Sequence, residues 1–83
     1  MNKNQIRARI NKLNDKLYDL QYELECLRDE IEEEIDNIEP YENRDELTEA
    51  QEERKEWMEE VVDYLRDAID NVEYAQSDLS NIG

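Results

Sequence analysis

The sequence has no His and no Phe, and it has only one Gly, one Pro, one Cys and one Trp among 83 residues. Without His, and with Cys26 as the single cysteine, it lacks the side chains that most zinc, haem and di-iron sites require. Cys26 cannot form a disulfide within the chain, which fits a reducing, cytoplasmic environment. The scarcity of Gly and Pro among many strong helix formers predicts an all-α chain, and no apolar run is long enough to span a membrane.

Basic residues are also scarce, because ten Lys and Arg against 25 Asp and Glu give a net charge of −15. Residues 1–16 hold five basic residues and one acidic residue, a net of +4, whereas residues 17–83 carry a net of −19. The acidic part would repel a phosphate backbone, so we expect the basic residues to pair with acidic residues of the second helix or of a partner protein rather than with nucleic acid. These basic residues, the basic segment, are Lys3, Arg7, Arg9, Lys12 and Lys16.

Apolar residues recur at steps of three and four, which predicts two long amphipathic helices rather than the disorder that high charge often brings. We expect one domain over 1–83, with a helix over about 5–39, a polar connection over 40–47 and a helix over about 48–79. Pro40 disfavours helix at the residue before it. Because the connection is short and the helices are equally long, the sequence predicts an antiparallel helical hairpin.

Polar side chains near the expected helix starts are candidate caps. Asn2 or Asn4 would cap the first helix. Thr48 as N-cap with Gln51 three residues later matches a capping box for the second helix.

The apolar stripe of the first helix is regular and then shifts by one position, which places Glu34 where an apolar residue was due. Such a shift favours a locally packing helix over a long coiled coil. The stripe is Ile6, Ile10, Leu13, Leu17, Leu20, Leu24, Leu27 and Ile31, followed by Ile35 and Ile38. The second helix has a matching stripe of Met58, Val61, Leu65, Ala68, Val72, Ala75, Leu79 and Ile82.

The second helix is apolar over a wider arc than a two-helix seam needs, because Trp57, Val62, Tyr64 and Ile69 lie beside its stripe. A hairpin alone also buries little core. We therefore expect a second neighbour, either another copy in a homodimeric four-helix bundle or a partner protein. The sequence leaves the orientation of such a dimer open.

An acidic stripe follows the opposite side of the second helix without one Lys or Arg. Like charges at i,i+4 destabilise a helix by about 0.2–0.5 kcal/mol per pair, so stability alone does not favour it. Residues 29–60 carry a net of −13, roughly one charge per 1.3 Å of hairpin against about 1.7 Å in duplex DNA. The acidic stripe comprises Glu49, Glu53, Glu56, Glu60, Asp63, Asp67 and Asp70.

Catalytic and metal-binding patterns are absent: the sequence has no Gly-rich phosphate loop, no nucleophile elbow and no EF-hand spacing. Exposed carboxylates without a walled pocket do not separate into acid and base. Tyr18, Tyr22 and Cys26 lie outside the apolar stripe at steps of four, and they form either a second packing ridge or an interface anchor.

The sequence thus predicts a non-enzymatic acidic protein with no cofactor and no metal. We expect it to act as a DNA mimic that inhibits a basic nucleic-acid-binding protein, such as a nuclease, in the manner of phage anti-CRISPR or anti-restriction proteins. The expected contacts are the acidic stripe with Tyr22, Trp57 and Tyr64 as anchors. The alternatives are a merely solvated acidic surface and a structural or adaptor module that binds a partner through its wide apolar side.

Overall fold

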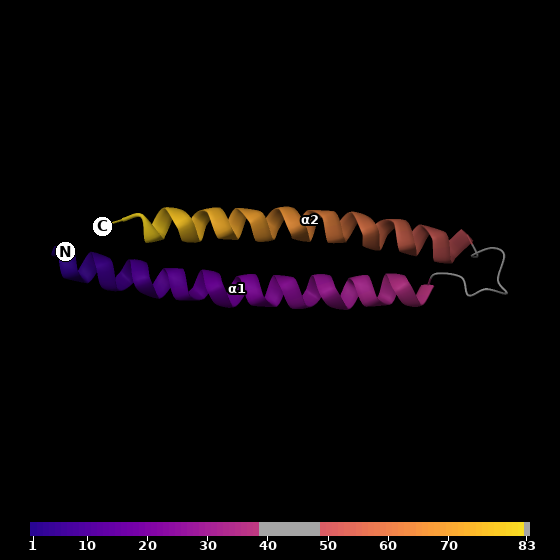
Figure 1. Ribbon diagram of the computed structural model, residues 1–83, viewed down its shortest axis with the longest axis horizontal. Coiled ribbons are helices and arrows are strands. Elements are labelled where there is room, and N and C mark those ends of the chain that lie inside the picture. The colour runs from indigo at the N-terminus through magenta and orange to yellow at the C-terminus, as the bar shows by residue number, and fades with distance from the viewer. Residues whose placement is uncertain (39–48, 83) are drawn as a thin grey trace.

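The computed structural model describes residues 1–38 and 49–82, and it shows two α-helices, α1 (Lys3–Ile38) and α2 (Glu49–Ser80), side by side (Figure 1). Both termini lie at the same end, so the helices are antiparallel and the expected hairpin is confirmed. The molecule measures 66 × 16 × 14 Å, with a radius of gyration of 19.2 Å. A compact domain of this length would have a radius of gyration of about 12 Å, so this fold exposes unusually much of its surface.

The start of α1 is fixed by a reciprocal pair of hydrogen bonds. Asn2 Oδ1 accepts from the Gln5 backbone N–H, and Gln5 Oε1 accepts from the Asn2 N–H, each at 2.9 Å. Asn2 is therefore the N-cap, and α1 begins at Lys3, earlier than the expected residue 5. The cap expected at Thr48 lies outside the described residues. At the other end, the N–H of Asn81 donates to the carbonyl of Ser77 at 3.1 Å and closes the last turn of α2.

The core lies in the seam between the helices and is small. The buried side chains of α2 are Met58, Val62, Ile69 and Gln76, and α1 has none that is fully buried. The half-buried seam residues of α1 follow steps of four and three without interruption, and they are Ile10, Asn14, Leu17, Gln21, Leu24, Arg28, Ile31, Ile35 and Ile38.

This seam corrects the register expected for α1. Leu13, Leu20 and Leu27 were expected in the seam, but they lie beside it with 53%, 42% and 46% of their surfaces exposed. The expected shift after Ile31 does not occur, because the seam runs on through Ile35 in one regular pattern. If Leu13, Leu20 and Leu27 lay in the seam, the next residue of their row, Glu34, would bring a charged side chain into it.

The seam also corrects the expectation that Val62 and Ile69 need a second neighbour. Each is only 5% exposed, so α1 alone covers them. Trp57 and Tyr64, in contrast, remain 64% and 71% exposed. Helix α2 therefore does expose apolar surface outside the seam, but this surface includes Trp57 and Tyr64 and excludes Val62 and Ile69.

A polar layer interrupts the seam towards the end where the termini lie. Gln76 Nε2 donates to Gln21 Oε1 at 2.7 Å, and Gln21 Nε2 donates to Glu73 Oε1 at 3.1 Å. Gln76 is 6% exposed. Buried polar side chains of this kind align two helices, because any other register leaves them without partners.

Candidate protein-binding surfaces

The hairpin has an apolar face, built from one row of each helix. In an antiparallel pair, equivalent rows lie on the same side of the hairpin. The residues that immediately precede Asn14, Gln21 and Arg28 in α1 therefore lie on the same side as those that immediately precede Val62, Ile69 and Gln76 in α2. The ion pair between Arg54 Nη2 and Glu34 Oε2, at 3.4 Å, joins these two rows and places them side by side. The apolar face consists of Ile6, Leu13, Leu20, Leu27, Val61, Ala68, Ala75 and Ile82.

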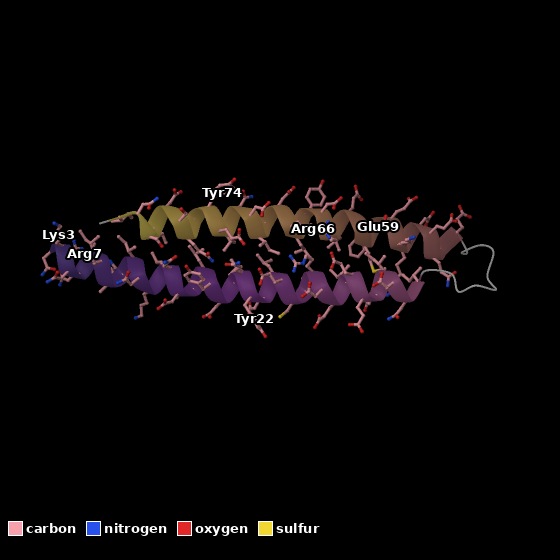
Figure 2. All side chains as sticks on the ribbon, in the orientation of Figure 1. Lys3, Arg7, Tyr22, Glu59, Arg66 and Tyr74 are labelled. Atoms are coloured by element: carbon pink, nitrogen blue, oxygen red, sulfur yellow. The ribbon has the colours of Figure 1, made fainter. Side chains whose placement is uncertain are left out.

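The opposite face, here the polar face, is closed by hydrogen bonds between the helices. Arg66 Nη2 donates to Glu32 Oε1 at 2.6 Å, and in Figure 2 Arg66 lies between the two helices. Asn14 Nδ2 donates to Ser80 Oγ at 3.4 Å at the terminal end. The polar face consists of Tyr18, Glu25 and Glu32 of α1 and Glu59, Arg66, Glu73 and Ser80 of α2.

The acidic stripe lies on the side of α2 that points away from α1. All seven of its carboxylates are exposed, and within the described residues none of them forms an ion pair. Trp57 and Tyr64 lie one helical turn from Glu60 and stand between the acidic stripe and the apolar face. The structure therefore brings these two expected anchors together with the carboxylates.

Tyr22 does not belong to that surface. It is 69% exposed and points away from α2, on the outer side of α1 (Figure 2). The Tyr22 pKa is raised above its ordinary value, first by the side-chain hydrogen bond with Cys26 and then by the negative charge of an ionised Cys26. A partner on the acidic stripe would lie across the hairpin from Tyr22.

The basic segment forms no ion pair with α2 within the described residues, so its expected pairing with α2 is not what holds the hairpin ends together. Its cations instead border a shallow groove of about 520 Å³. The groove is lined by Ile6, Ile10 and Leu13 and by Arg9, Lys12 and Lys16, with Met1 at its edge. An apolar floor with cationic walls fits an acidic amphipathic helix.

Among the described residues, no three Asp, Glu or Cys side chains are placed to hold a metal ion together. In the same part of the chain, neither helix has a segment that is both long and apolar enough to cross a bilayer. What the described surface offers is contact area and charge, which are the means of binding another macromolecule.

Comparisons of this chain with protein-family models, curated proteins and solved structures give no significant match. Functional inference therefore rests on the geometry of these two helices.

Proposed function

We propose that this protein acts by binding and not by catalysis, and that its acidic surface occupies the basic nucleic-acid-binding surface of another protein in place of DNA. The observation that carries the proposal is the exposed, unpaired acidic stripe of α2. Carboxylates that neither stabilise the helix nor pair within the described residues remain available to a cationic partner.

The charge density of the acidic tip, residues 29–38 and 49–60, supports this function. These residues include twelve acidic and two basic side chains, a net of −10. They span about 17 Å, so the tip carries roughly one net charge per 1.7 Å, the linear density of duplex DNA. A groove that binds duplex DNA would therefore meet a similar charge on this rod-shaped end.

Trp57 and Tyr64 would supply contact energy beside the charge. Both are exposed and border the acidic stripe, and large aromatic residues dominate the binding energy of many protein interfaces. The long-range charge would steer the encounter, and the aromatic side chains would slow dissociation. Inhibitors of bacterial nucleases, such as phage anti-restriction and anti-CRISPR proteins, are the functional class that this chemistry fits, and the cytoplasm is where such targets act.

The test is competition with DNA. Immobilised protein would capture basic proteins from a bacterial lysate, and each captured protein would be purified and bound to fluorescent duplex DNA. We expect this protein to displace the DNA, with an affinity that falls steeply between about 0.1 and 0.5 M salt because of screening. Captured proteins that release no DNA, or binding that ignores salt, would overturn the proposal.

Matched charge reversals separate the acidic stripe from net charge. The first variant changes Glu53, Glu56, Glu60 and Asp63 to Lys on α2. The control changes Asp15, Asp19, Glu23 and Asp78 to Lys, which are equally exposed and lie outside both the acidic stripe and the acidic tip. Both alter the net charge by the same amount, and we expect only the first to abolish displacement of DNA.

A second candidate function is favoured by the apolar face, which the hairpin leaves uncovered. The protein would then be a structural or adaptor module, and the simplest form is a homodimer in which two hairpins make a four-helix bundle. Changing Leu13 to Lys would abolish such binding and leave DNA competition by the acidic stripe intact.

A further inference from the structure

The apolar face exposes large aliphatic side chains along α1 and at Ile82, whereas Val61, Ala68 and Ala75 of α2 are half-buried. Leu13 is 53% exposed, Leu20 42% and Ile82 52%. This apolar strip runs from Ile6 to Leu27, about 32 Å along α1. It ends where Glu34 pairs with Arg54, so the uncovered apolar surface is bounded in length.

The exposed area of the whole chain shows how much surface is left to cover. The protein exposes 6848 Å². A compact monomer of this size would expose about 5,300 Å². The excess of about 1,500 Å² exceeds the roughly 800 Å² that each partner buries in an interface of standard size.

From this face we propose that it is covered by the same face of a second copy, and that the two hairpins lie antiparallel. This pairing rests on the homodimer proposed above and is independent of the target of the acidic stripe. A two-fold axis across the centre of the strip sets Ile6 opposite the second copy's Leu27, and Leu13 opposite its Leu20. The Ile6–Leu27 rows of the two α1 helices then overlap over their full length, and each acidic tip projects beyond the other hairpin's termini.

Charge decides between the two orientations. Beside the strip on α1, the exposed rim changes from Arg9 and Lys16 near the N-terminus to Glu23 and Glu30 towards the tip. In the antiparallel pair, Arg9 of each copy faces Glu23 of the other, and the cationic groove receives the Leu20–Leu27 segment with its acidic rim. A parallel pair would instead stack two acidic tips, each with a net of −10 over its described residues, at a repulsive cost that no cation offsets.

Sedimentation equilibrium tests the face. We expect a dimer for the wild type and, for Leu13→Lys, a dissociation constant at least about tenfold higher, because a cation enters the apolar interface. Tyr18→Lys is the matched control: Tyr18 lies on the polar face, with 54% exposure against 53% for Leu13. We expect less than about a threefold change from it, since a polar rim contributes little. A monomeric wild type, or equal effects of the two variants, would overturn the pairing.

The orientation is measured by pulsed electron–electron resonance between spin labels on Asp36→Cys, with Cys26→Ser to remove the native thiol. Asp36 is exposed and lies near the acidic tip, off the apolar face. Antiparallel copies place the two labels about 58 Å apart along the bundle, whereas parallel copies hold them within about 30 Å. The short distance would overturn the antiparallel arrangement while leaving the dimer, and the absence of a dimer would overturn both.

Discussion

The two long faces of the hairpin use the same helices in opposite ways. On the polar face, Arg66 reaches Glu32 and Asn14 reaches Ser80 across the seam. On the apolar face, Leu13, Leu20 and Leu27 are exposed to solvent, and the helices are joined by the exposed Arg54–Glu34 pair near the acidic tip. One face is completed by the chain itself, and the other has the composition of a core without its cover. The difference shows that a helix pair can pack around one seam and still leave an apolar face exposed.

The largest expected effect separates the seam from the apolar face. Ile69→Ala should lower the free energy of unfolding by about 2–5 kcal/mol, because Ile69 is 5% exposed in a very small core. Leu20→Ala, at 42% exposure, should cost less than about 1 kcal/mol in dilute solution. Urea unfolding followed by circular dichroism measures both. Equal costs at low concentration would mean that the apolar face is already packed within one hairpin.

The polar layer gives the next effect. Gln76→Leu should cost about 1–3 kcal/mol in urea unfolding, because the side chain of Gln21 loses the hydrogen bond that it accepts at 2.7 Å. The double variant with Gln21→Leu as well should recover most of that stability, since no buried polar group is then unpaired. A double variant as unstable as the single one would show that the Gln21–Gln76 pair contributes to stability beyond the hydrogen bond that its two side chains share.

The ion pairs of the two faces should differ only slightly. Arg66→Ala should cost about 0.5–1 kcal/mol, because Arg66 and Glu32 are partly exposed, at 58% and 38%. Arg54→Ala should cost less, since the side chains of its pair are 62% and 59% exposed and 3.4 Å apart. Thermal unfolding in low and high salt checks both values. A cost that persists unchanged in about 1 M salt would rule out a screened surface pair.

The smallest effect concerns Tyr22, on the outer edge of α1. Its pKa is raised, so its phenolate should form at a higher pH than that of an ordinary tyrosine, in an absorbance titration assigned with Tyr22→Phe. Cys26→Ser should move the midpoint back towards the ordinary value of 10.0. The folded-state pKa lies above the unfolded one, so the linked stability is present below pH 10 and is lost as the pH rises through the folded pKa. An unchanged midpoint in Cys26→Ser would show that Cys26 does not raise the Tyr22 pKa.

The sequence predicted the helices, their antiparallel course and the exposure of the acidic stripe, because these follow from local periodicity and from Pro40. It did not predict the seam register. In α1, three rows lie side by side, beginning at Ile6, Ile10 and Asn14, and the two-helix seam takes only the last two. The row with Leu13 and Leu20 is the more apolar one, but it continues to the charged Glu34, whereas the polar row that the seam uses instead continues to Ile35. Pairing between distant residues, such as Gln21 with Gln76, decides the register, and no local pattern encodes it.

The sequence also could not place the candidate anchors relative to one another. Tyr22 has the same residue type and exposure as Tyr64, yet the two lie on different sides of the hairpin. A helical repeat assigns a side chain to a side of its own helix, but the direction of that side in the molecule depends on how the second helix docks. That direction is set by the contacts between the two helices in the seam, which the periodicity of a single helix does not contain.

The order of the cross-links along the seam has a consequence for how the chain folds. The partners are 20 residues apart at Glu34–Arg54, 34 at Glu32–Arg66 and 66 at Asn14–Ser80. Closing the longest of these loops costs only about 1 kcal/mol more in chain entropy than closing the shortest. Folding that begins at the tip therefore has only a small entropic advantage. The tip is also where like charges are densest, and their repulsion opposes the first contacts. Added salt should therefore accelerate folding of this hairpin, with the rate limited by electrostatic repulsion at the end where chain entropy is most favourable.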